Sequence, residues 1–190
     1  MLFIVLPDIA IEDQLLSRAQ QDNTAALREI YTTYFPPVFR YIRLRVANIQ
    51  EAEDLTGDVF LKLITAFRGK NPPKQSLRGW LFRVARNVMY DYYSKKKKFT
   101  ETALEDWIPA SDSLDPEVQF IRSMSAERAR VAILQLKFDQ QEVVILRFGH
   151  MLSLQETAAI MSKSISSIKS LQFRALNNLR RSLEGMRSNG

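Results

Sequence analysis

Residues 152–181, LSLQETAAIMSKSISSIKSLQFRALNNLRR, decide the fold of the second half of this 190-residue chain. Ser153 and Glu156 form the S-x-x-E pattern of a capping box, which predicts that a short helix begins here. A turn follows at residues 162–163, and Ser164 is a suitable N-cap for a longer second helix. A short helix, a tight turn and a longer helix are the anatomy of a helix-turn-helix.

The longer helix has an apolar face and a polar face. The predicted inner face carries apolar residues at helical spacing: Ile165, Ile168, Leu171, Ala175, Leu176 and Leu179. The predicted outer face carries short polar groups and cations of the size that reads the DNA major groove, with one aromatic residue: Ser166, Ser167, Lys169, Ser170, Gln172, Phe173 and Arg174. An ordinary pair of packed helices with a basic face remains the alternative.

Charge divides the chain into three blocks. Residues 1–98 include 16 basic and 10 acidic residues. Residues 99–121 include 6 acidic residues and no basic residue, and residues 122–190 include 11 basic and 5 acidic residues. The net charge of +6 suits a protein that works against a polyanion. The acidic block is rich in Pro, Ser and Asp, which favour turns, so it predicts a flexible linker between two basic modules.

Composition excludes several kinds of site. The chain has no cysteine, so it holds no disulfide, no thiolate metal site and no cysteine nucleophile. The only histidine, His150, is expected at the surface or in a turn rather than in a zinc site. The apolar opening MLFIVLP ends well short of the roughly twenty residues that a bilayer crossing needs, and it lacks the basic start of a signal peptide. We therefore expect a cytoplasmic protein with no membrane insertion.

The first module has helical periodicity throughout and no alternation typical of a strand. Pro36 and Pro37 are expected to kink or restart its first long helix. Gly69, Asn71 and two prolines predict a loop, after which the next helix opens at Ser76. The sequence therefore predicts an all-α protein of two small helical domains.

The helix that opens at Ser76, SLRGWLFRVARNVMYDYYSKKKK, mixes aromatic and cationic side chains. An apolar seam docks it, which leaves polar, basic and aromatic residues on the other faces: Arg83, Arg86, Asn87, Tyr90, Asp91 and Tyr93. Bases stack on aromatic rings while cations hold phosphates, so this face has the equipment of a single-strand binding surface. The alternative for this helix is a solvated surface helix with a basic C-terminal end. The lysine run that begins at Lys95 either contacts phosphates or serves as a solubilising segment.

Several blocks in this order resemble one family. The segment EDLTGDVFLKL, then the helix from Ser76, then the acidic linker, then QQEVVILRFGHM followed by the helix-turn-helix, resemble the extracytoplasmic-function (ECF) group of the sigma-70 family. The likeness covers roughly residues 24–183. It implies an N-terminal segment (residues 1–23), sigma region 2 (24–98), an acidic linker (99–125) and sigma region 4 (126–190).

The resemblance implies partners and site residues. Bacterial core RNA polymerase would be bound by Asp54, Leu55, Asp58, Val59, Phe60 and Lys62. The single-stranded minus-ten element would be held by Arg68, Trp80, Arg83, Arg86, Asn87, Tyr90, Asp91, Tyr93 and Lys95, with a flipped base in or near the loop of residues 68–75. The minus-thirty-five duplex would be read by the outer face of the helix from Ser164. An anti-sigma factor is also suggested, although no residue requires one.

Two departures from the family pattern and two rival functions remain. Gly57 stands where the family usually has glutamine, and Ser162 replaces a glycine frequent in the turn, where we expect the residue not to be fully left-handed.

One rival function is that of a stand-alone helix-turn-helix regulator. The other is a nuclease that uses Asp54 and Asp58 with magnesium, although no third convergent acid or phosphate-cradling glycine loop is evident. We predict no catalytic residue, metal or cofactor.

Overall fold

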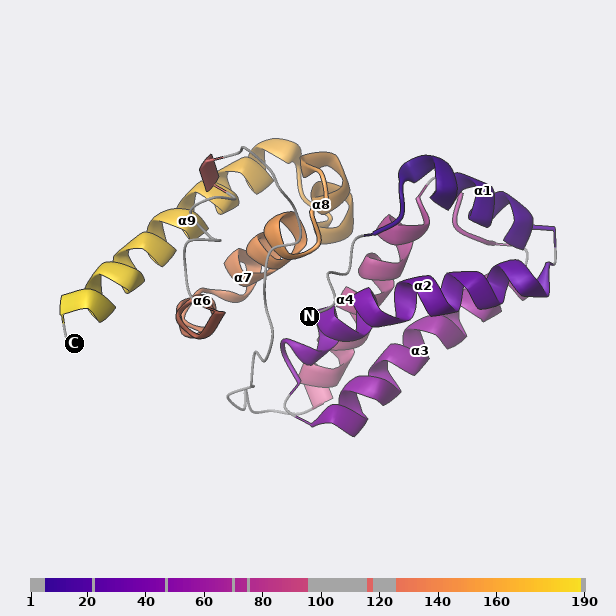
Figure 1. The fold of residues 1–190 in the computed structure, drawn as a ribbon, viewed down its shortest axis with the longest axis horizontal. Helices are drawn as coiled ribbons and strands as arrows, with labels where there is room; N and C mark the ends of the chain where they lie inside the picture. Colours follow the sequence, from indigo (N-terminus) through magenta and orange to yellow (C-terminus); the bar gives the residue numbers. More distant parts are fainter. Residues whose placement is uncertain are drawn as a thin grey trace. The chain divides into compact units, whose positions relative to one another are not determined.

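The computed structural model describes residues 6–21, 23–46, 48–69, 71–74, 76–95, 116–117 and 126–188. These residues form helices and no strand, which confirms the predicted all-α fold. They fall into two compact units that divide near residues 103 and 104, and each is described by itself (Figure 1).

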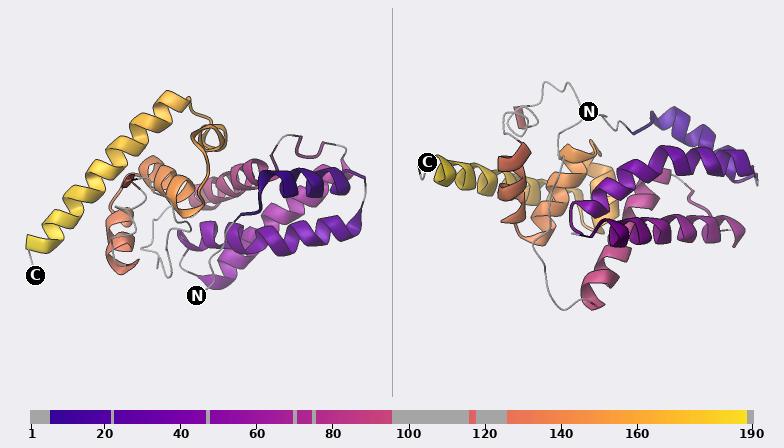
Figure 2. Two further views of the ribbon diagram at one scale, coloured as in Figure 1. Left: turned by 45° about the horizontal axis from the view of Figure 1, so that its top comes forward. Right: turned by 60° about the horizontal axis from the view of Figure 1, so that its bottom comes forward.

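The described residues of the first unit form four helices: α1 (Ile9–Ala19), α2 (Thr24–Arg43), α3 (Ile49–Arg68) and α4 (Leu77–Lys95). Helix α3 packs against α2 and α4, and α1 packs across α2 and the start of α4 (Figures 1 and 2). The fully buried side chains of Tyr34, Tyr41, Phe82 and Leu81 come from α2 and α4 and form the centre of this unit. Apolar burial of this kind is the main driving force that holds helices together.

Helix α1 lies where the sequence predicts only an N-terminal segment. The Asp8 carboxylate caps it by accepting a hydrogen bond from the Ala10 amide at 3.1 Å. Leu15, Leu16 and Ala19 are buried against the rest of the unit. The opening residues 1–5 lie outside the described part of the chain.

Helix α2 does not restart at its proline pair. It is continuous from Thr24 to Arg43, with Pro36 and Pro37 inside it. Proline cannot donate the helical hydrogen bond, so the pair weakens the ladder locally. Tyr34 and Val38 are both completely buried on either side of the pair, and this shared buried face keeps the two halves in one helix.

The described residues from 126 onward form a π-helix among four α-helices: α6 (Ala126–Leu134), α7 (Phe138–Val144), η1 (Ile145–Gly149), α8 (Leu154–Met161) and α9 (Ile165–Ser188). Helix α9 packs against α6, α7 and α8 (Figures 1 and 2). The predicted capping box at the start of α8 is confirmed, because Ser153 Oγ accepts from the Glu156 amide at 3.1 Å and Glu156 Oε2 accepts from the Ser153 amide at 2.7 Å.

The inner face of α9 is nearly as predicted. Ile168, Ala175, Leu176 and Leu179 are buried, whereas Ile165 is 41% exposed. Ile165 is the first residue of α9 and precedes the stretch that packs on the unit, so assigning it to the core was wrong.

The turns around α8 differ from expectation at two residues. Ser162 has φ 54° and ψ 44°, so it is fully left-handed and the expected milder conformation was wrong. His150 lies in a turn directly after η1, as expected, but it is buried, with only 8% exposed, so it is not the surface residue that the sequence also allowed.

Candidate functional site

The outward side of α3 is more apolar than the sequence suggests. Asp54, Asp58 and Lys62 are exposed and Leu55 is half-buried, while Leu61 and Ile64 are 62% and 37% exposed. Gly57 lies on the same side, and an added Cβ there would meet nothing within 4 Å. We call these residues the α3 outer face: Asp54, Gly57, Asp58, Leu61, Lys62 and Ile64.

Two predicted contact residues of α3 do not reach this surface. Val59 and Phe60 are 0% and 4% exposed, because they lie on the core side of the helix. Their role is to hold α3 in the unit, so predicting them as direct contacts was wrong. Leu61 and Ile64, which the sequence analysis does not single out, are exposed, and their helical spacing sets them apart from the core positions Val59, Phe60 and Leu63.

The outer face of α4 combines cations with aromatic rings. Arg83, Asn87 and Asp91 are exposed, and Tyr90 is 47% exposed. The Arg86 guanidinium carbon lies 4.9 Å from the centroid of the Tyr90 ring, within the range of a cation–π contact. Trp80 is half-buried, and Arg68 is exposed at the end of α3. An exposed ring beside cations is able to stack a base while the cations hold its phosphates.

The tyrosines near the end of α4 are tied down by the first unit itself. The Tyr93 hydroxyl donates to the Arg45 carbonyl, and the Tyr92 hydroxyl donates to Glu51 Oε2 at 2.7 Å. Burial raises the pKa of Tyr93 to about 12, so its hydroxyl stays protonated. The Tyr93 side chain is half-buried and its hydroxyl is engaged within the first unit. The side chain of Lys95 and the rest of the lysine run lie outside the described residues.

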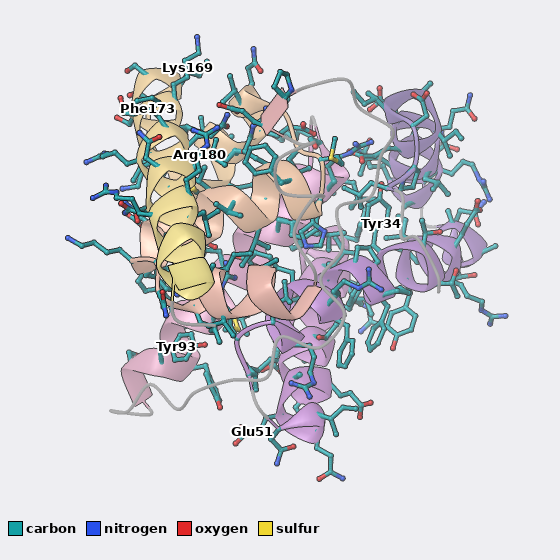
Figure 3. All side chains as sticks on the ribbon, turned by 60° about the vertical axis from the view of Figure 1, so that its left-hand side comes forward. Tyr34, Glu51, Tyr93, Lys169, Phe173 and Arg180 are labelled. Carbon is teal, nitrogen blue, oxygen red and sulfur yellow. The ribbon has the colours of Figure 1, made fainter. Side chains whose placement is uncertain are left out.

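The outer face of α9 presents short polar groups to solvent. Six of its predicted residues are exposed: Ser166, Ser167, Lys169, Ser170, Phe173 and Arg174. Phe173 is 64% exposed and, like Lys169, projects outward from the helix (Figure 3). The Ser164 hydroxyl accepts from the Ser167 amide at 3.2 Å, so it caps the helix at the start of this face.

A groove of about 760 Å³ adjoins this face. Lys163 and Asp139 form an ion pair of 3.1 Å beside it. The groove is lined by Asp139, Ser162, Lys163, Ser166, Ser167, Ser170, Leu171 and Arg174. Serine hydroxyls and cations in a groove at the start of a helix suit a strand of phosphates or the edges of bases.

Gln172 is placed differently from its predicted neighbours. It is half-buried, and its Oε1 accepts from Arg147 Nε at 3.0 Å. Its Nε2 donates to the Glu117 carboxylate. Both ends of the amide are therefore engaged within the second unit, so the structure makes Gln172 an anchor of α9 rather than part of its outer face.

Within the described ranges, no group of three or more His, Cys, Asp and Glu side chains is arranged to hold a metal ion. The same ranges contain no helix with the length and apolar character needed to cross a membrane.

Comparison with known families identifies both units. Residues 30–99 match the family model for sigma-70 region 2, and residues 132–181 match the model for sigma-70 region 4. Together these matches cover more than half of the chain. The chain belongs to the sigma-70 family of RNA polymerase sigma factors.

Named relatives place this sigma factor in the ECF group. The ECF RNA polymerase sigma factor BldN of Streptomyces coelicolor is 33% identical over 90% of this chain, which spans 65% of that protein, just under two thirds of its length. The RNA polymerase sigma factor YlaC of Bacillus subtilis is 28% identical, over 83% of this chain and 92% of YlaC. The sigma factor RpoE of Bartonella quintana, solved with the anti-sigma factor NepR, has a TM-score of 0.62 and 25% identity, over 83% of this chain and 96% of that chain.

The matched regions fit the two units of this ECF sigma factor. Region 2 covers most of α2 and all of α3 and α4, and region 4 begins within α6 and ends within α9. Helix α1 lies before the region 2 match. The relatives are sigma factors, which are not enzymes.

Proposed function

We propose that this chain binds bacterial core RNA polymerase in the cytoplasm and directs it to promoters by contacting two DNA elements in different ways. The observation that carries this proposal is the pairing of two kinds of exposed face in one chain. One suits single strands, with Tyr90 under Arg86, and the other suits duplex DNA, with serines and cations along α9. A stand-alone regulator needs only the second kind.

The α4 face is proposed to hold the melted minus-ten strand. Stacking of a base on an aromatic ring contributes about 1 to 3 kcal/mol, and neighbouring cations add backbone contacts. Arg83, Arg86 and Tyr90 supply both on one helix, and the α3–α4 loop, residues 69–76, adds the exposed Asn71 and Lys74. We propose that a flipped non-template base lies against this loop.

The α9 face is proposed to read the minus-thirty-five duplex. The N-terminal residues of a recognition helix usually reach base edges, while cations farther along meet phosphates. Ser166, Ser167 and Ser170 lie in the first two turns of α9, and Arg174 follows them. We assign the serines to bases and Arg174 to a phosphate.

The α3 outer face is proposed to dock on the polymerase. Exposed carboxylates of Asp54 and Asp58 beside exposed Leu61 and Ile64 fit a partner surface with cations around an apolar centre. An anti-sigma factor that covers the same face would block docking. We further propose the four segments set out above, residues 1–23, 24–98, 99–125 and 126–190, with no catalytic activity in any of them.

The test is run-off transcription with a bacterial core polymerase, with and without this chain, on DNA upstream of its own gene. We expect a specific transcript only with the chain, and weak promoter binding by the free chain, because two units joined by a linker bind together only when held at a fixed separation. Nanomolar specific binding by the free chain at physiological salt would favour the stand-alone regulator. Magnesium-dependent cleavage of plasmid DNA would favour the nuclease.

A further inference from the structure

One buried carboxylate ties helix α1 to the start of α4. Glu12 is 2% exposed, and its Oε1 accepts from the Leu77 amide at 2.8 Å, the Arg78 amide at 3.2 Å and Ser76 Oγ at 3.2 Å. Its Oε2 accepts from the Tyr34 hydroxyl at 2.8 Å and from Arg78 Nε at 2.6 Å. The first amides of a helix lack partners within it and lie at the positive end of its dipole. The position of α1 therefore fixes where α4 begins.

The ion pair between Glu12 and Arg78 suits a positioning role. Both side chains are largely removed from solvent, at 2% and 11% exposed, and Arg78 Nη2 also donates to the Pro7 carbonyl before α1. A buried ion pair adds little net stability over apolar side chains of the same size, and its best attested use is to fix one arrangement of the segments that carry it. Here those segments are α1 and α4.

A second tie joins the other end of α1 to the α3–α4 loop. Gln20, the C-cap residue of α1, donates from Nε2 to the Pro73 carbonyl at 2.9 Å. Pro73 is buried, whereas Asn71 and Lys74 on either side of it are exposed. Helix α1 thus holds the loop at Pro73 through Gln20 and at Ser76 through Glu12.

We infer that α1 is a positioning element for base recognition by the α3–α4 loop, with Gln20 and Glu12 as its positioning residues. The inference rests on the proposed function, in which this loop holds a flipped base of the minus-ten strand. A binding constellation discriminates only when its backbone is held within about 0.5 Å of the productive geometry. The two ties supply that restraint from a helix that precedes the region 2 match at residue 30.

The experiment uses the full chain with core polymerase and a promoter library randomised across the minus-ten element, with the transcripts sequenced. Gln20→Ala should reduce base preference at one minus-ten position by about fivefold, the effect of one hydrogen bond. Core co-purification should stay unchanged, and the melting temperature should fall by no more than a few degrees, because Gln20 is exposed and only one hydrogen bond is lost. Gln20→Lys keeps a donor and should restore the preference, whereas Gln20→Glu sets an acceptor against the Pro73 carbonyl and should not.

Two controls separate loop positioning from general docking of α1. Gln21→Ala changes the exposed neighbour, and Arg18→Ala breaks an exposed 3.1 Å ion pair to Glu29 that joins α1 to α2 without reaching the loop. Both should keep the parental preference. Glu12→Gln removes the charge opposite Arg78 and should flatten the preference as Gln20→Ala does; if it fails to fold, the Gln20 series decides.

The inference is overturned if Gln20→Ala keeps the parental preference at every minus-ten position. It is equally overturned if Arg18→Ala flattens the preference as much as Gln20→Ala. Absence of any transcript from the parental holoenzyme is a separate result, which overturns the proposed function and the inference with it.

Discussion

The two units support their outward faces in different ways. In the first unit, α4 and the loop before it are held by side chains distant in sequence: Glu12 reaches Arg78 across 66 residues, and Glu51 reaches Tyr92 across 41. In the second unit, the start of α9 is organised by Ser164, within three residues of the serines it contacts. The first face is therefore a property of the whole unit, and the second is a property of a short segment.

The largest expected effect breaks the first unit's link to polymerase. Asp54→Lys with Asp58→Lys should abolish transcription, because repulsion at a docking surface costs several kcal/mol, on the order of 1000-fold in affinity. Both residues are exposed, so helical content and melting temperature should hardly change. Co-purification with core polymerase, alongside circular dichroism, measures this.

A charge-matched control is Asp13→Lys with Glu29→Lys, which reverses two exposed acids on α1 and α2. This variant should still co-purify with polymerase. If the Asp54 and Asp58 variant co-purifies as well, the α3 outer face does not dock on the polymerase.

The second effect compares long-range and local support by denaturant unfolding. Glu12→Ala should lower the free energy of unfolding by about 3 to 5 kcal/mol, because it leaves the buried Arg78 charge without this carboxylate. Ser153→Ala removes the capping box of α8 and should cost about 1 kcal/mol. Equal losses in the two variants would show that the units are supported alike.

The third effect concerns which residues of α9 contact bases and which contact phosphates. Lys169→Ala and Arg174→Ala should weaken transcription from all promoters and reduce its salt sensitivity, each by about one phosphate contact. Changes at Ser167 or Ser170 should instead alter the preferred upstream sequence, with about 1 to 3 kcal/mol at stake per base pair. A randomised minus-thirty-five library measures both. The assignment would be wrong if the serine variants kept the parental sequence preference while the Arg174 variant acquired a different one.

The smallest effects lie at one residue in each unit. Gly57→Ala should stabilise the protein by about 1 kcal/mol, because the site is open and alanine is the better helix former. Ser162→Gly should stabilise it by about 0.5 kcal/mol, because relief of the left-handed conformation is partly offset by the freer unfolded chain. Thermal unfolding measures both, and a destabilising Gly57→Ala would show that the site is not open.

Local patterns in the sequence were the most reliable guide to this fold. The capping box at Ser153 and the buried positions Ile168 and Leu176 follow from residue spacing within one helix, and the structure has them as predicted. The outer serines of α9 follow from the same periodicity. Such features depend on neighbours three or four residues away, which a single sequence contains.

Features that depend on distant partners were missed or misplaced. The sequence gives no sign that Glu12 is buried, because its partners Tyr34 and Arg78 come from two other helices. Gln172 looks like an outer residue of α9 until Arg147 is seen to hold it. Helix α2 likewise continues through Pro36 because side chains on either side of it are buried, and helix propensity alone does not account for that burial.

The tie between Glu12 and Arg78 also bears on how the protein folds during synthesis. Chains grow at about 5 to 20 residues per second, so the 66 residues between the two partners take roughly 3 to 13 s to make. For that interval α1 has left the ribosome without the helix start that its carboxylate caps, and Leu15 and Leu16 have no completed core to enter. The first unit therefore closes only when α4 emerges, so the earliest helix of the chain is among the last parts of that unit to become stable.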